Sequence, residues 1–60
     1  MGEIAVGKIV IVSQEMQHLG YRAVAQVIDY FPNETDQYLL KWIGGYIRRV
    51  HFNQIKDVVD

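Results

Sequence analysis

Short apolar segments, separated by glycine and by polar turns, cover most of this chain. Residues 8–13 read Lys-Ile-Val-Ile-Val-Ser, and four β-branched residues in a row favour a strand because a helical turn restricts their χ1 angles. Residues 38–43 and 46–52 are also rich in strand formers, and residues 55–59 are apolar enough to add a last short strand. These four segments predict most of a small sheet.

Two turn signals separate the predicted strands. Residues 32–36 read Pro-Asn-Glu-Thr-Asp, a composition typical of a loop. Gly44 and Gly45 both accept positive φ angles, so they predict a tight hairpin turn between residues 38–43 and 46–52. Such a turn would bring Trp42 and Tyr46 close together across the two strands.

The segment 14–31 has two interpretations, and both remain open on the sequence. With a period of 3.6 it forms an amphipathic helix that Ser13 could cap, which gives a β-α-β-β chain. With a period of 2, Gln14 begins a loop that ends at Gly20, and a strand follows whose two faces alternate. Gly20 favours the strand, because glycine inside a helix costs about 1 kcal/mol. On that interpretation one face holds Tyr21, Ala23, Ala25 and Val27, and the other holds Arg22, Val24, Gln26 and Ile28.

The strand interpretation predicts an all-β chain, a single domain over residues 1–60. Its order of elements resembles the small five-stranded barrels of the Src-homology-three (SH3) type, in particular the KOW, Tudor and chromo-barrel kinds. Residues 7–12 resemble the Gly-x-x-Val-x-Val opening of KOW barrels, and residues 38–42 resemble the chromo-type pattern Tyr-Leu-Val-Lys-Trp. Residues 52–54 stand where such barrels place a single helical turn. The resemblance implies an SH3-like barrel whose only helical turn lies there.

Length and composition limit how this chain is stabilised. Sixty residues suffice for one domain, and a domain of this size buries only about 60% of the surface that its unfolded chain exposes. The chain contains no cysteine, so disulfides and thiolate zinc sites are excluded. Its stability must come from the apolar half of the composition or from partner subunits. With no apolar run of membrane-spanning length and no visible secretory signal, we expect a cytoplasmic protein.

The sequence offers little for catalysis. Ser13 and Thr35 are the only side-chain hydroxyls besides the tyrosines, and no spacing sets a base beside either of them. The glycine pair lacks the Lys-Ser/Thr that follows the glycines of a phosphate-binding loop. The two histidines, His18 and His51, cannot complete a tetrahedral metal site without help from carboxylates. We therefore expect no enzymatic activity, no cofactor and no metal, with His51 on the outer face of a strand.

Aromatic and basic residues are the candidates for binding. The chain is rich in tyrosine for its size, and we expect some rings to be exposed, as aromatic residues are at interfaces. Our candidates for exposed rings are Tyr21, Trp42 and Tyr46. Basic residues flank the glycine turn, and Arg48 and Arg49 point to opposite faces if they lie on one strand. The predicted binding residues are Lys41, Trp42, Tyr46, Arg48, Tyr21 and His18, the last of these either a contact residue or simply solvated.

Two functions follow from these residues. The net charge of −1 and the aromatic content favour a module that binds another protein or itself. The alternative is a nucleic-acid-binding barrel, in which cations hold phosphates and rings stack on bases. An enzyme assembled at an oligomer axis ranks third. The first two differ in whether the basic residues share one face.

Overall fold

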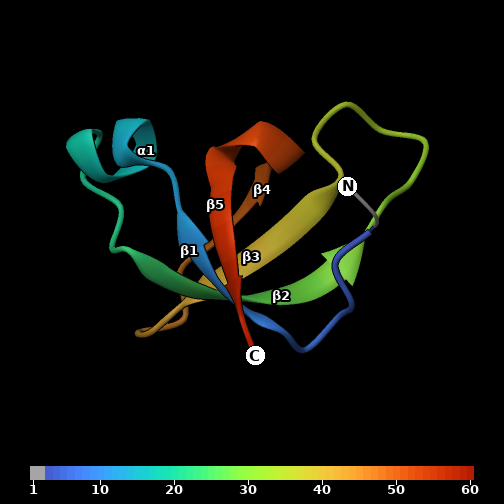
Figure 1. Cartoon of the computed structure of the whole chain (residues 1–60), viewed down its shortest axis with the longest axis horizontal. Coiled ribbons are helices and arrows are strands. Elements are labelled where there is room, and N and C mark those ends of the chain that lie inside the picture. The colour runs from blue at the N-terminus through green and yellow to red at the C-terminus, as the bar shows by residue number, and fades with distance from the viewer. Residues whose placement is uncertain (1–2) are drawn as a thin grey trace.

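The computed structural model describes residues 3–60 and consists mainly of strands (Figure 1). In chain order, the elements are β1 (Ile9–Val12), α1 (Gln14–His18), β2 (Val24–Tyr30), β3 (Tyr38–Trp42), β4 (Ile47–Val50), the 3-10 turn η1 (Phe52–Gln54) and β5 (Ile55–Val59). The prediction of a strand in the second half of segment 14–31 is confirmed. The loop around residues 32–36 and the strands predicted within residues 8–13, 38–43 and 55–59 are also confirmed, and the strand predicted for residues 46–52 is shorter, from Ile47 to Val50.

All strand pairs are antiparallel and belong to one sheet of order β4-β3-β2-β1-β5. The strands β4 and β5 are the edges of this sheet, which curls around its apolar face without closing (Figure 1). The chain therefore belongs to the all-β class, with one short helix added. Within residues 3–60, neither helical element is long and apolar enough to cross a membrane.

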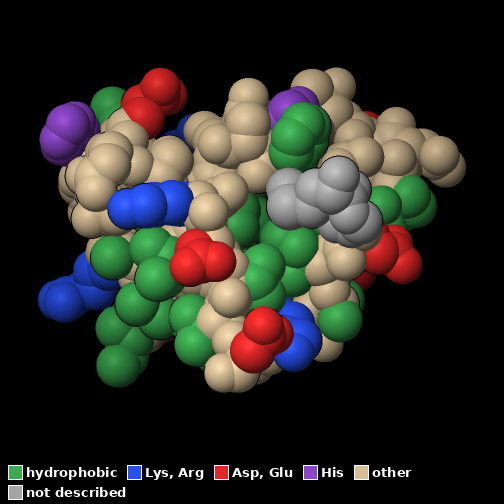
Figure 2. All heavy atoms as spheres, in the orientation of Figure 1, with side chains coloured by type: hydrophobic (Ala, Val, Ile, Leu, Met, Phe, Trp, Pro, Cys, Tyr) green, Lys and Arg blue, Asp and Glu red, His purple; other side chains and the backbone are tan. Residues whose placement is uncertain are grey.

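Strand alternation builds the core. Every second residue of β1, β2 and β3 points to the concave side, where Val10, Val27 and Leu40 are fully buried. The remaining core residues are Ile4, Val12, Met16, Ala25, Tyr38, Trp42, Val50 and Ile55. The opposite side of the sheet leaves apolar side chains exposed among charged ones, as Figure 2 shows on the face that carries β1, β2 and β5. The two faces predicted for β2 are confirmed, since Ala25 and Val27 are buried.

The loop predicted from Gln14 to Gly20 is wrong in its first part, because α1 occupies residues 14–18. Ser13 caps this helix, and its hydroxyl accepts a hydrogen bond from the Met16 amide at 3.3 Å. The Met16 side chain is 1% exposed and packs in the core. The burial of Met16 thus stabilises one helical turn here. The prediction that the only helical turn lies at residues 52–54 is therefore wrong.

The helical turn predicted for residues 52–54 is confirmed as η1. The prediction that His51 lies within a strand is wrong, because β4 ends at Val50 and His51 caps η1 instead. Its Nδ1 atom accepts a hydrogen bond from the Asn53 amide at 3.2 Å, and its own amide donates to the Gln54 side chain at 2.9 Å. These local hydrogen bonds compete with strand pairing and end β4.

The glycine hairpin joins β3 to β4 as predicted. Gly44 and Gly45 have φ angles of 95° and 91°, a region that other residues seldom adopt. The Gly45 amide donates to the Trp42 carbonyl at 3.1 Å, and the Trp42 amide donates to the Tyr46 carbonyl at 2.8 Å. The turn therefore holds Trp42 opposite Tyr46.

Candidate functional site

Three aromatic rings gather beside the glycine hairpin. Tyr21 lies between α1 and β2, Trp42 ends β3, and Tyr46 lies between the glycine turn and β4. The ring centroids are 5.2 Å apart for Tyr21 and Trp42, 5.8 Å for Tyr21 and Tyr46, and 5.9 Å for Trp42 and Tyr46. All three pairs are tilted at distances typical of favourable aromatic contacts. We call these three residues the aromatic cluster.

Trp42 was predicted to be exposed, and that prediction is wrong. The side chain is 4% exposed and belongs to the core. Its Nε1 atom donates to the Arg22 carbonyl at 2.9 Å, which satisfies the one polar group of the indole. The period-2 pattern carried this information, because Trp42 shares a face with the buried Tyr38 and Leu40. Trp42 is thus the floor of the cluster, below the 57% exposed Tyr46 and the half-buried Tyr21.

Arg48 completes the exposed surface of the cluster. It pairs with the buried Leu40 in the β3–β4 ladder, so its side chain leaves the strand on the side of the core. There its guanidinium lies over the Tyr21 ring, 5.1 Å from the centroid, and donates a hydrogen bond to the Tyr21 hydroxyl. The same hydroxyl lies 3.4 Å from that of Tyr46. Tyr21, Tyr46 and Arg48 therefore form one connected surface.

The hydrogen bonds at the Tyr21 oxygen shift the pKa values of Tyr21 and Tyr46 in opposite directions. The pKa of Tyr21 is lowered, first by the hydrogen bond it shares with the Tyr46 hydroxyl and then by Arg48, because both interactions favour the phenolate. The pKa of Tyr46 is raised by the same hydrogen bond to Tyr21. The pKa of Arg48 is raised as well, chiefly by its hydrogen bond to Tyr21, so this side chain stays charged. The surface therefore combines one cation with two tyrosine hydroxyls whose pKa values are shifted in opposite directions.

Two open clefts meet at this part of the sheet. The smaller one, of about 390 Å³, is lined by Leu19, Gly20, Tyr21, Arg22, Trp42, Ile43 and Tyr46. The larger one, of about 530 Å³, is lined by Ile9, Arg22, Ala23, Val24, Ala25, Gln26, Lys41, Trp42 and Ile43. Arg22, Trp42 and Ile43 contribute to both clefts, and Ile43 is 84% exposed. The aromatic cluster therefore borders a continuous, partly apolar surface.

The other predicted site residues lie elsewhere. Lys41 is exposed and lines only the larger cleft. His18 is exposed at the end of α1 and lines neither of the two clefts, which agrees with a solvated side chain. Arg49 lies with its guanidinium 4.4 Å from the Phe31 ring centroid and 4.0 Å from Glu34. The prediction that Arg48 and Arg49 point to different surroundings is confirmed.

Sequence reasoning did not find Leu19 or Arg22 as parts of this surface. Leu19 follows α1, and its 67% exposure follows from a helix that ends after one turn. Arg22 contributes its backbone carbonyl, which accepts the hydrogen bond from Trp42. A pattern of side chains along the sequence cannot predict such a backbone contact. The contact between Tyr21 and Arg48 joins residues 27 positions apart and depends on how the segment after α1 folds back over β3 and β4.

Among residues 3–60, no group of three or more His, Cys, Asp or Glu side chains could hold a metal ion. Comparisons with protein-family models, with curated proteins and with solved structures found no match to this chain. Its function must therefore be argued from the surface itself.

Proposed function

We propose that this chain is a small, non-catalytic protein-binding module of the SH3-like barrel type. The observation that carries this proposal is the connected surface of Tyr21, Tyr46 and Arg48 above the buried Trp42. Tyrosine, tryptophan and arginine are the residues most enriched where protein interfaces bind most strongly. The single sheet of five strands and the turn at residues 52–54 support the barrel type.

The arrangement of the surface favours binding without much loss of entropy. The Tyr21 ring contacts Trp42, Tyr46 and Arg48, so none of these side chains has to be ordered when a partner arrives. Each rotamer-rich side chain that a partner must immobilise costs about 0.5–1.5 kcal/mol. A preorganised patch of rings and one guanidinium is therefore suited to a protein partner, which includes a second copy of the chain. The cytoplasm is the location we propose for it.

The distribution of the cations supports a protein partner over a nucleic acid. Arg48 lies on the aromatic cluster, Arg49 lies beside Glu34 and Phe31, and Lys41 faces the larger cleft. No single track of cations for a phosphate backbone results from these three positions, and the net charge is −1. Tyr46 beside Arg48 is the one feature that would also suit a single-stranded nucleic acid.

Replacing Tyr46 tests the proposal, because this ring is exposed and its loss leaves the core intact. In affinity capture followed by titration with the recovered protein, Tyr46→Ala is expected to lose about 2 kcal/mol of binding, close to thirtyfold in affinity. Phe52→Ala is the matched control, since Phe52 is also an exposed ring, at 46%, but contacts His51 instead of the cluster. A salt titration with mixed-sequence oligonucleotides runs beside it. If the chain binds the oligonucleotides in a salt-dependent way and Arg48→Ala weakens this binding, the partner is a nucleic acid and the proposal of a protein partner is wrong.

A further inference from the structure

The two edges of the sheet differ in what their backbones offer. At the β4 edge, the bond from the Trp42 amide to the Tyr46 carbonyl marks a hydrogen-bonded pair. Such pairs alternate along an antiparallel ladder, so Arg48 bonds to Leu40, whereas Ile47 and Arg49 form non-hydrogen-bonded pairs. The amide and carbonyl groups of Ile47 and Arg49 therefore point away from β3. Among residues 3–60, no other strand pairs with β4, and these groups face an open edge.

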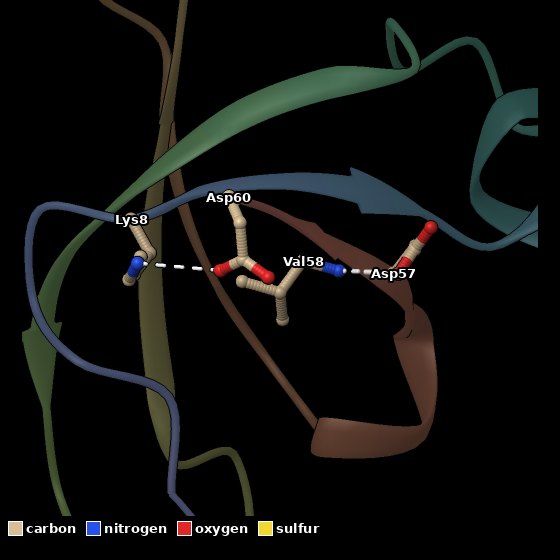
Figure 3. Close-up of polar contacts among 4 residues, drawn as sticks. All are labelled: Lys8, Asp57, Val58 and Asp60. Carbon is tan, nitrogen blue, oxygen red and sulfur yellow. Dashed lines mark hydrogen bonds and ion pairs between the residues drawn. The ribbon is translucent and has the colours of Figure 1, made fainter.

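The β5 edge is blocked by a side chain of its own. The Val12 amide donates to Ala23 next to β2, and the Ser13 amide donates to Gln54 next to β5, so Val10 and Val58 form a non-hydrogen-bonded pair. The Val58 amide consequently points to the free edge, where it donates to Asp57 Oδ1 at 2.8 Å (Figure 3). The β1–β5 ladder also shifts register between Ile11 and Val12. A capped amide and a bulge are two ways in which edge strands are kept from pairing.

We propose that the β4 edge accepts an extended acidic segment of a partner protein as an added strand. This inference rests on the proposed protein-binding function and names the kind of partner. The edge carries Arg48 and Arg49 on its two faces, beside backbone groups that are free to form a ladder. Carboxylates on the added strand would lie opposite these guanidiniums, and oppositely charged cross-strand pairs stabilise a sheet.

The same two arginines argue against a second copy of the chain at this edge. Pairing β4 with another β4 would place four guanidiniums on one short ladder, and like charges at opposed positions destabilise it. The existing contacts leave the charges available. Arg48 is held by a phenol, and Arg49 donates from Nε to the Asp36 carbonyl at 3.2 Å, so both hydrogen bonds go to uncharged groups. The only ion pair of Arg49 within residues 3–60 is with Glu34, at 4.0 Å between side chains that are 41% and 60% exposed. Since Arg48 also contacts Tyr21, a strand on this edge continues directly into the aromatic cluster.

Amide hydrogen exchange tests the proposal residue by residue. The probe is the peptide acetyl-Thr-Val-Thr-Glu-Glu-Val-Thr-amide, whose two glutamates lie opposite Arg49 and Arg48 in an antiparallel register. We expect the Ile47 and Arg49 amides to exchange quickly in the free protein and to slow at least tenfold when the peptide saturates it. Arg48 and Val50 are expected to be protected throughout, and Val58 to remain unchanged. Saturation without slower exchange at Ile47 and Arg49 would overturn the proposal.

Charge reversal provides the second measurement. Arg49→Glu is expected to weaken binding of the acidic peptide about tenfold, because an attraction becomes a repulsion. Lys56→Glu on β5 makes the same change of charge at the other edge and is expected to leave the affinity unchanged. A peptide with lysine in place of glutamate should not bind, and equal binding of both peptides would overturn the proposal. A concentration-dependent dimer whose β4 amides are protected would also overturn it in favour of self-pairing.

The two proposals fail in different ways. If peptide binding shifts the NMR signals of Tyr21 and Tyr46 but leaves the exchange of the Ile47 and Arg49 amides unaltered, the aromatic cluster binds and the strand addition is wrong. If those amides become protected while Tyr46→Ala has no effect on the affinity, the edge binds and the cluster is not the contact surface. Protection together with a Tyr46 effect supports both.

Discussion

At the scale of single residues, the aromatic side chains of the cluster differ in burial and therefore in their roles. Trp42 is buried and fixes the floor, whereas Tyr46 is exposed and presents its ring and hydroxyl to solvent. Tyr21 stands between them and accepts hydrogen bonds at its oxygen. From this order of burial we expect a substitution at Trp42 to change stability and one at Tyr46 to change the surface.

The hydrogen bond between the two hydroxyls predicts an unequal tyrosine titration. Tyr21 has a lowered pKa and Tyr46 a raised one, so Tyr21 should lose its proton first as the pH rises. A lowered folded-state pKa adds stability only above the ordinary tyrosine range, and that contribution disappears as the pH falls through the folded-state value. The Tyr21 shift therefore stabilises the folded chain at alkaline pH, and this contribution is lost as the pH falls.

Phenolate absorbance in the ultraviolet measures this titration, with Tyr46→Phe as the informative variant. The substitution removes the first cause of the lowered pKa of Tyr21, so its ionisation should move toward the ordinary value. Tyr30→Phe is the control, because the pKa of Tyr30 is raised chiefly by burial and Tyr30 stacks on Tyr38 instead of the cluster. An early-titrating tyrosine that persists unchanged in Tyr46→Phe would mean that the hydroxyl contact does not exist in solution.

At the scale of elements, the strands could be predicted from the sequence, whereas the length of the helix could not. The β-branched run in β1 and the alternation in β2 and β3 encode burial on one face, and this signal is visible in any strand that is buried on one side only. The helical interpretation of segment 14–31 identified the Ser13 cap but not the end of the helix, because α1 has only five residues. This short helix exists because the capped turn buries Met16. Tyr46 and Arg48 were named correctly as neighbours of the hairpin, whereas Tyr21 was expected to be exposed and is half-buried. The mutual contact of these three residues depends on the tertiary fold.

The glycine hairpin gives a prediction at this scale. Gly44→Val should destabilise the chain by about 1–3 kcal/mol, because a β-branched residue is strained at a φ of 95°. A Cβ atom at this position would meet nothing within 4 Å, so the cost comes from the backbone alone. Gly44→Asn is the matched control, since asparagine tolerates positive φ better than valine does. Urea denaturation measures both variants, and equal midpoints for valine and asparagine would contradict the positive φ.

At the scale of the whole molecule, the small core leaves little reserve of stability. Within residues 3–60 the core consists of 11 buried residues on one side of an open sheet, and a single core in a domain of this length supplies only about 3–5 kcal/mol. Met16 joins α1 to this core and is one of the largest fully buried side chains. Any substitution that creates a cavity there removes a large share of the total free energy of unfolding.

Met16→Ala is therefore expected to unfold a large part of the population at room temperature. Truncating a buried methionine to alanine costs about 2–5 kcal/mol, which is comparable to the whole stability of the chain. Met16→Leu keeps most of the side-chain volume and should stay folded with a loss below about 1.5 kcal/mol. Far-ultraviolet circular dichroism measures the sheet content. The fluorescence of Trp42, which is buried at the end of β3 opposite to Tyr38, reports on the packing of the core. The two signals should change together in both variants, since α1 and the sheet share one core. A Met16→Ala protein that keeps its sheet signal and a buried Trp42 would instead show that α1 is a separate unit resting on an independently stable sheet.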